Sequence, residues 1–265
     1  MQTVTDNESG ELGGITRAAI YDSFISKTDD LLAIEGFLAR LAERHSLPRF
    51  GRMLDVGCGT GRVLPILARI SEKVTGIDMN TEYLEQARTY AKELQLSNVD
   101  LQHCDLSQWK EQEAFDLVSM INGVFYYFES GVALEAAFAH VYAALKPGGF
   151  CVAEGGNLLY FLRHYGAGFA AETICEIKGK RVTRHIRHSL DLAGARWTHH
   201  DSYEIEGYEG KEFREQHTFT IFTPLAIREA LERVGFVTAS VHNGWNPNGE
   251  SDRSPGRLVF VARKP

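Results

Sequence analysis

The chain lacks an excess of positive charge. Its 28 lysines and arginines are outnumbered by 35 aspartates and glutamates, which gives a formal net charge of −7. Nucleic-acid binding depends on basic side chains that neutralise phosphates, so this balance disfavours a nucleic-acid partner. The sequence also contains no apolar run of the roughly 18 residues that a membrane-spanning helix needs. We therefore expect no nucleic-acid partner and no membrane partner.

Cysteine is scarce as well. The four cysteines never form a C-x-x-C pair. No secretory leader is expected, because residues 1–12 are polar and acidic. Free thiols in a reducing compartment fit this pattern, so we predict a cytoplasmic protein without disulfides. The sequence leaves a homo-oligomer open.

What the chain does have is a regular alternation of short apolar strands and amphipathic helices. Apolar runs predict strands at 51–57, 73–79, 99–106, 115–122 and 149–155, and helices are expected between them. Such an alternation produces a parallel sheet with right-handed crossovers. After residue 154 the pattern changes, and the segments 172–190, 195–210 and 211–223 predict antiparallel strands joined by glycine turns.

This organisation predicts an α/β fold: a Rossmann-like, mostly parallel seven-stranded sheet with helices on both faces and an inserted antiparallel β meander. We expect four parts along the chain. They are an N-terminal helical cap over 1–48, a ligand-binding core over 49–156, the antiparallel insertion over 157–222, and a C-terminal completion of the core sheet over 223–265.

The stretch "MLDVGCGTGR" at 53–62 carries three glycines, Gly57, Gly59 and Gly61, directly after the first core strand. A Gly-x-Gly-x-Gly loop before a helix exposes backbone N–H groups and lets a ligand lie against the main chain. The dinucleotide-binding fingerprint G-x-G-x-x-G would place its third glycine where Arg62 stands. A nicotinamide-dependent dehydrogenase is therefore disfavoured.

The segment "LDVGCGTG" resembles the first motif of the class I S-adenosylmethionine (SAM)-dependent methyltransferases. Three more segments resemble motifs of that family in the expected order: "VTGIDMN" and "HCDL" at the second and third strands, and "LKPGGFCVAE" at the fifth. The resemblance covers about residues 50–155. It implies SAM as the cofactor and S-adenosylhomocysteine as the product.

The resemblance also implies roles for three acids. Asp78 would hold the ribose hydroxyls, Asp105 would meet the adenine amine, and Asp55 would organise the loop and face the methionine amino group. Each acid has a simpler alternative, because Asp78 could cap the next helix, Asp105 could shape a turn, and Asp55 could stabilise the loop. The expected cofactor-binding residues are Tyr21, Asp55, Gly57, Cys58, Gly59, Gly61, Asp78, Met79, Asp105, Leu106 and Asn122.

Three of these residues complete the expected cofactor pocket. Met79 and Leu106 would give the adenine an apolar face and a backbone N–H group. Tyr21 resembles an N-terminal tyrosine that covers the cofactor in small-molecule members of the family, although it could equally be a surface aromatic of a helix.

The fourth strand continues into "INGVFYYFES", which is apolar and aromatic rather than acidic. Ligands in open α/β sheets bind beyond the strand ends, so Asn122, Phe125 and Tyr126 would line the junction between methyl donor and acceptor. The alternative is that the aromatic residues pack in the core. Because the segment has no cluster of acids, we predict no metal. Phe125, Asn157 and Tyr160 are the expected substrate-binding residues.

The segment "REQHTFTIFTPLAIREALERVGF" resembles a region of glycine and amino-sugar N-methyltransferases in which an antiparallel lid covers the acceptor. Strand alternation places Glu215, His217, Phe219 and Ile221 on one face. An imidazole is a suitable base near neutral pH, so His217 is a candidate catalytic residue together with Tyr126. The alternative is a structural histidine, as most of the ten histidines must be.

These observations predict a SAM-dependent methyltransferase that acts on a small-molecule acceptor. An amine nitrogen of a metabolite or natural product is the favoured methyl acceptor. The alternatives are an O- or C-methyltransferase of a small natural product, and a SAM-binding protein without catalysis.

Overall fold

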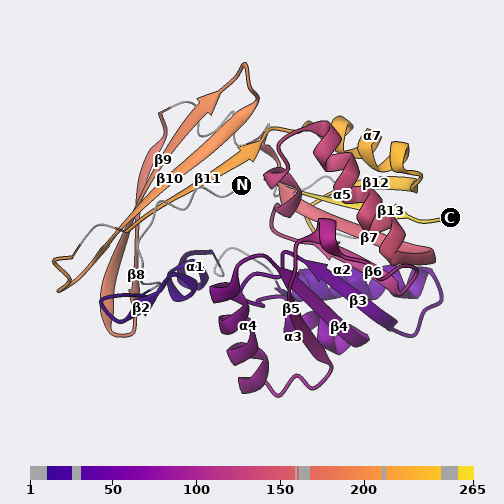
Figure 1. Ribbon diagram of the computed structural model, residues 1–265, viewed down its shortest axis with the longest axis horizontal. Helices are drawn as coiled ribbons and strands as arrows, with labels where there is room; N and C mark the ends of the chain where they lie inside the picture. Colours follow the sequence, from indigo (N-terminus) through magenta and orange to yellow (C-terminus); the bar gives the residue numbers. More distant parts are fainter. Residues whose placement is uncertain (1–10, 26–30, 159, 161–167, 211–212, 246–255) are drawn as a thin grey trace. The chain divides into compact units, whose positions relative to one another are not determined.

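A computed structural model describes residues 11–25, 31–158, 160, 168–210, 213–245 and 256–265 (Figure 1). The chain divides into two compact units. Residues 30–158 and 222–265 form one, called the core unit below, and residues 1–29 and 159–221 form the other, called the meander unit. The segment 1–48, expected from the sequence to be one helical cap, is therefore shared between the two units.

The core unit is built on a seven-stranded sheet with the order β12-β13-β7-β6-β3-β4-β5. The strands β3 to β7 pair in parallel, and β13 joins β7 and β12 in antiparallel fashion. Their bounds are Phe50–Val56 (β3), Ser71–Asp78 (β4), Val99–His103 (β5), Phe115–Met120 (β6), Leu145–Gly156 (β7), Val237–Asn243 (β12) and Arg257–Arg263 (β13). The predicted mostly parallel sheet is confirmed, and the antiparallel strands β12 and β13 belong to it.

The helices of the core unit begin where the sequence provides caps. Asn80, Ser130 and Thr223 each accept a hydrogen bond from a backbone N–H in the first turn of the following helix. The helices are α2 (Leu31–Arg44), α3 (Leu64–Ile70), α4 (Thr81–Glu93), α5 (Gly131–Ala144) and α7 (Pro224–Val234), with short 3-10 turns η2 (Leu106–Gln108) and η3 (Val124–Tyr127).

Helices cover both faces of the core sheet, as predicted. Met53, Leu117, Val152 and Val259 share one apolar cluster with buried residues of α2, α3 and α4. The neighbouring strand residues point to the opposite face, which α5 and α7 cover through contacts with β6, β7 and β12. Strands buried on both faces explain the near-continuous apolar runs in the sequence.

The meander unit contains a four-stranded antiparallel sheet with the order β11-β10-β9-β8. Its strands are β8 (Ala170–Ile177), β9 (Lys180–Asp191), β10 (Arg196–Ile205) and β11 (Phe213–Thr220). The hairpin β1 (Glu11–Leu12) and β2 (Ile15–Thr16) and the helix α1 (Arg17–Ile25) belong to the same unit. Leu12, Ile15 and Ile20 pack with the inner side chains of this sheet.

The four cysteines are free thiols. No helix in the part of the chain that the structure describes is long and apolar enough to cross a membrane.

Candidate active site

The carboxyl ends of four parallel strands meet at one edge of the core sheet. Val56 pairs with Ile77, Asp78 with His103, and Asp55 with Ser119, so the ends of β3 to β6 are aligned. The chain order changes direction at β3, with β4 and β5 on one side and β6 and β7 on the other. Open α/β sheets bind ligands in the crevice beside such a change of direction.

The three glycines of the loop after β3 serve different purposes. All three have positive φ, at +68° for Gly57, +56° for Gly59 and +86° for Gly61. A Cβ atom at Gly57 would lie 2.6 Å from Val124, and one at Gly61 would lie 2.8 Å from Leu64. A Cβ at Gly59 would have no described atom within 4 Å. A side chain at Gly57 or Gly61 would therefore clash with a neighbouring residue, whereas the backbone of Gly59 faces open space.

Asp78, at the end of β4, fixes this open part of the loop. Its Oδ2 accepts a hydrogen bond from Gly59 N at 2.8 Å, and its Oδ1 accepts one from Asn80 N at 2.8 Å. Asn80, not Asp78, is the N-cap of α4. Burial raises the pKa of Asp78, while the backbone donors act in the opposite direction. Each carboxylate oxygen can accept a second hydrogen bond, so Asp78 can still receive hydroxyl groups of a ligand.

Asp55 carries a buried acceptor with no protein partner. Its side chain is 1% exposed. Oδ1 accepts a hydrogen bond from the Ser119 hydroxyl at 2.7 Å, and among the described residues Oδ2 has no donor. Burial, with the nearby charge of Asp78 adding to it, raises the pKa of Asp55 to about 7. A buried acceptor without a donor fits a ligand that brings its own, such as the ammonium group of SAM.

The segment after β5 lies next to Asp78, because Cys104 N donates a hydrogen bond to Asp78 O at 3.0 Å. Asp105 accepts a hydrogen bond from Ser107 N at 2.8 Å and so caps η2, which is the turn role considered from the sequence. Leu106 is buried, and Met79 is 67% exposed. The exposed Met79 side chain gives this edge an apolar surface, which an aromatic base can contact.

Asn122 is held in a turn by two residues that the sequence analysis missed. Asn122 and Gly123 have φ of +67° and +78°. The fully buried Glu154 accepts a hydrogen bond from Asn122 N at 2.9 Å, and Gly123 N donates to Glu154 O at 2.8 Å. Arg257 pairs with Glu154 and donates to Asn122 Oδ1 at 3.3 Å. A glutamate inside the apolar run of β7 was the signal that could have revealed this network.

The aromatic residues of η3 lie in the core of this unit. Phe125 is fully buried and packs edge-on against Phe260, with ring centroids 5.9 Å apart. The Tyr126 hydroxyl donates a hydrogen bond to Gly156 O at 2.7 Å, and burial raises the pKa of Tyr126. This placement favours the packing alternative for both side chains. Asn157, just past β7, donates its N–H to Gly256 O at 2.8 Å.

Tyr21, Tyr160 and His217 belong to the meander unit. His217 lies opposite His199 in the register of β10 and β11, and Glu215 lies opposite Asp201. His217 Nε2 is 3.8 Å from Glu215 Oε2, and the Tyr203 hydroxyl donates to the same oxygen at 3.4 Å. His217 and Glu215 therefore share one face of the sheet, as strand alternation predicts.

The residues that the structure brings together at the core edge fit a nucleoside bearing an amino acid. The Gly59 backbone is open to a ligand, and the Asp78 carboxylate can accept the hydroxyl groups of a sugar. Asp55 Oδ2, for which the described residues supply no donor, can accept an ammonium group. Within the described residues no group of three or more His, Cys, Asp or Glu is arranged to hold a metal ion.

Comparison with known proteins supports this interpretation. Residues 53–149 match the family model described as "Methyltransferase domain". The chain is 30% identical over 220 residues to dTDP-3-amino-3,6-dideoxy-alpha-D-glucopyranose N,N-dimethyltransferase of Streptomyces fradiae, covering 82% of this chain and 79% of that protein. It is 26% identical to dTDP-3-amino-3,4,6-trideoxy-alpha-D-glucopyranose N,N-dimethyltransferase of Streptomyces venezuelae, covering 93% and 97%.

Solved structures show the same fold. A SAM-dependent methyltransferase from Clostridium acetobutylicum superposes with a TM-score of 0.78 at 19% identity, covering 93% of this chain and 96% of that one. The sugar N-methyltransferase KedS8 from Streptoalloteichus superposes with a TM-score of 0.74 at 22% identity, covering 99% of each chain. Together with the sequence relatives and the glycine loop, these findings show that the chain belongs to the class I SAM-dependent methyltransferases and is an enzyme that uses SAM.

Proposed function

We propose that the chain transfers the methyl group of SAM to an amine nitrogen of a small molecule, and that this molecule is an amino sugar linked to a nucleotide. Three relatives that align over most of this chain are named as N,N-dimethyltransferases of dTDP-linked amino sugars. Their names differ in the position of the amino group, so the position on the sugar is left to experiment.

The cofactor half of the proposal depends on the buried Asp55 oxygen for which the described residues supply no donor, at the end of the strand that leads into the open Gly59 loop. Asp55 would receive the ammonium group, and Asp78 would receive the ribose hydroxyls through its remaining lone pairs. Asp105, Met79 and Leu106 would hold the adenine. Gly57, Cys58 and Gly61 would shape the loop, and Asn122 would stand at the junction with the acceptor.

SAM supplies an activated methyl group whose sulfur leaves without needing a proton. The chain must therefore hold the acceptor in line with the methyl group, exclude water and accept one proton from the attacking amine. His217, with Glu215 beside it, is the proposed proton acceptor. Tyr126 has its hydroxyl committed to Gly156 O, so His217 is preferred as the base.

The parts of the chain would divide this work. Residues 49–156 would hold the cofactor, and residues 223–265 would complete the core sheet. Residues 157–222 would cover the acceptor, with Asn157 and Tyr160 contributing to its pocket. Tyr21, in the N-terminal segment, would cover the cofactor. A cytoplasmic location and the oligomeric state stay predictions.

The proposal is tested by methyl transfer from labelled SAM to matched sugar nucleotides. A dTDP-linked 3-amino sugar, its 4-amino isomer and the corresponding 3-hydroxy sugar are compared, with S-adenosylhomocysteine release measured in parallel. We expect label in one or both amino sugars and none in the hydroxy sugar. Equal transfer to the hydroxy sugar would indicate an O-methyltransferase. SAM binding without transfer to any acceptor, including a panel of simple amines, would contradict the enzymatic proposal.

The role of His217 has a matched control in the same sheet. His200 lies one position beyond His199 on β10, so its side chain points to the opposite, exposed face. We expect His217→Asn to lower kcat about 100-fold, the typical contribution of a general base, without changing SAM affinity. His200→Asn should leave kcat unchanged. Equal rates for the two variants would remove His217 from the mechanism.

A further inference from the structure

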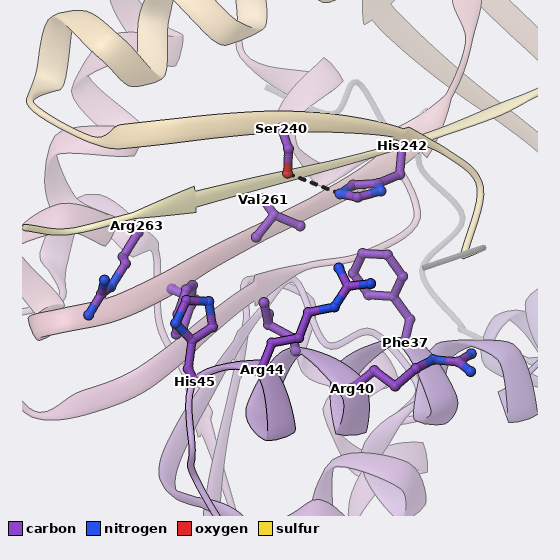
Figure 2. A pocket seen from close by; sticks show the side chains of 10 residues that line it. Phe37, Arg40, Arg44, His45, Ser240, His242, Val261 and Arg263 are labelled. Carbon is purple, nitrogen blue, oxygen red and sulfur yellow. Dashed lines mark hydrogen bonds between the residues drawn. The ribbon is translucent and has the colours of Figure 1, made fainter. Parts of the chain in front are cut away.

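The core unit contains a cavity that the methyltransferase site does not use. Its volume is about 310 Å³, and it lies between α2 and the strands β12 and β13 (Figure 2). Phe37, Arg40 and Arg44 reach it from α2, and His45 follows directly after that helix. Ser240 and His242 reach it from β12, and they are joined by a hydrogen bond of 3.0 Å.

The cavity extends along β13 from the row of His242, Val259 and Glu154 to Arg263, away from the carboxyl ends of the parallel strands. Arg263, which lines the cavity, pairs with Phe150 in the first half of β7. Arg257, which belongs to the Asn122 network, pairs with Gly156 at the end of β7. A strand rises by about 3.3 Å per residue, so the two arginines are roughly 20 Å apart along β13.

The lining of the cavity is basic in a chain that is acidic overall. Arg40, Arg44 and Arg263 line it together with His45 and His242, and none of the described lining residues is acidic. The chain as a whole has a formal net charge of −7. This local reversal of charge favours an anionic ligand over a neutral or cationic one.

The pKa values of the two histidines in the lining reflect the same positive charge. Burial lowers the pKa of His45, and Arg263 and Arg44 lower it further. Burial also lowers the pKa of His242, again with Arg44 acting in the same direction. An anion inside the cavity would oppose both effects and would raise the pKa of each histidine.

The remaining lining is apolar. Phe37, Leu41, Phe150 and Val261 contribute the hydrophobic part of the wall. His45 stacks obliquely on Phe150 with ring centroids 4.5 Å apart, and Phe37 meets His242 edge-on at 5.1 Å. A ligand that fills the cavity must therefore combine an anionic group with an apolar or aromatic portion.

From this geometry we propose that the cavity is a second binding site, for a small phosphorylated molecule with an aromatic or apolar portion. A phosphate monoester carries about −1.5 to −2 charges at pH 7, and its oxygens match the planar donor fork of arginine. A carboxylate brings one charge and two acceptor oxygens, whereas a phosphate monoester brings up to two charges and three acceptor oxygens. The volume is at the lower end of the range of about 300–1,000 Å³ for ligand pockets, which suits a compact molecule.

Arg44 is the principal anion-binding residue of this site. Figure 2 shows its guanidinium group extended over Phe37 toward His242, whereas the guanidinium group of Arg40, one turn earlier on α2, is turned away from them. Arg263 donates a hydrogen bond to Gly148 O at 3.2 Å, and its guanidinium group lies over the Phe150 ring. These contacts already fix the position of Arg263. Arg44 and Arg40 therefore make a matched pair of variants.

The first experiment compares three probes by titration calorimetry with the full chain. Phenyl phosphate has the proposed chemistry, benzoate is a monoanion of similar shape, and benzyl alcohol is uncharged. We expect phenyl phosphate to bind at least about tenfold more tightly than benzoate, and benzyl alcohol not to bind. Equal binding of benzoate, or no binding of phenyl phosphate at millimolar concentration, would overturn the proposal.

The second experiment locates the bound phosphate. Arg44→Met should weaken phenyl phosphate binding about tenfold or more, and Arg40→Met should weaken it less. In NMR titrations of the wild-type chain, phenyl phosphate should raise the pKa of His45 and His242. SAM affinity should be the same in both variants, which separates this site from the catalytic one. Equal losses in Arg40→Met and Arg44→Met, or unchanged histidine pKa values, would contradict a defined site.

Discussion

The core unit and the meander unit each contain a buried ion pair between an arginine and a carboxylate. In the core unit Glu154 is fully buried beside Arg257, whose side chain is 23% exposed. In the meander unit Asp201, with a side-chain exposure of 2%, receives two hydrogen bonds of 3.1 and 2.9 Å from Arg184. The two sheets thus use the same chemistry at nearly the same depth.

The surroundings of the two pairs differ. Glu154 stands near the end of β7 and also accepts the backbone N–H of Asn122, so this pair fixes a turn at the ligand-binding edge. Asp201 stands in the middle of β10, opposite Glu215, with the imidazole of His199 two residues before it. In the core unit, polar side chains at the strand ends, such as Asp78 and Glu154, also accept hydrogen bonds from backbone N–H groups. In the meander unit they are held by one another, across the register of three strands.

The largest loss of stability is expected when the arginine of either ion pair is removed. Arg257→Met and Arg184→Met each leave a buried carboxylate without its partner, and each should lower the free energy of unfolding by about 3–5 kcal/mol. Urea denaturation measures both losses. Arg228→Met, which removes only an exposed pair with Glu232, should change it by no more than ~0.5 kcal/mol.

The same variants sharpen the difference in role. Arg257→Met should also lower methyl transfer, because the turn at Asn122 loses a support. A double variant, Arg184→Met with Asp201→Leu, should recover much of the stability lost in Arg184→Met, because it removes the unpaired charge. If Arg257→Met leaves kcat/KM unchanged at a temperature where the variant is folded, the positioning role of the Glu154 pair is wrong.

Asp78→Ala tests whether backbone-held polar groups create the cofactor site. The variant loses the acceptor of Gly59 N and Asn80 N as well as the proposed contact to the ribose. We expect SAM affinity to fall about 100-fold, equivalent to the loss of one or two charge-assisted hydrogen bonds. Calorimetry measures the effect. Asp105→Ala, which removes a cap of η2, is the control and should lower affinity less; a reversed order would contradict the assigned roles.

The contrast between the two units also explains what the sequence could predict. The alternation of strands and helices, the glycine loop and the roles open to Asp78 are local, because each depends on a few consecutive residues and their backbone. The seven-stranded sheet and the inserted meander were therefore predictable. The Asn122–Glu154–Arg257 network was not, since its members are separated by up to 135 positions in the chain. The neighbours of His217 likewise depend on the register of β10 and β11, which sequence alone does not specify.

The meander unit should be the more sensitive of the two to acid. His199 is half-buried, stacks on His188 with ring centroids 4.2 Å apart, and has a pKa lowered to about 3, first by desolvation and then by His188. Because the unfolded chain takes up this proton at its ordinary pKa of 6.5, the neutral histidine contributes stability above that pH. This contribution is lost as pH falls from 6.5 toward 3.

We expect His199 to account for about 2 kcal/mol of the stability lost between pH 7 and pH 5. Between pH 7 and pH 5 the free energy of unfolding of His199→Gln should fall by about 2 kcal/mol less than that of the wild-type chain, whatever its value at pH 7. The exposed His200→Gln is the control and should keep the wild-type slope. An unchanged slope in His199→Gln would show that the imidazole is not held neutral.

The smallest of the expected effects concerns the core unit and is a pH dependence of its affinity for SAM. Burial raises the pKa of Asp55 to about 7, so the free enzyme holds a proton there at pH 5.5 that an ammonium contact must displace. SAM affinity should therefore rise about tenfold between pH 5.5 and pH 7. Asp55→Asn should bind SAM more weakly and without this pH dependence. Without ligand the sign is reversed: the raised pKa stabilises the fold at low pH, and this contribution is lost as pH rises from 3.8 through about 7. A pH dependence of SAM binding that survives in Asp55→Asn would assign the proton to another group and would leave the unpaired Asp55 oxygen without a role in cofactor binding.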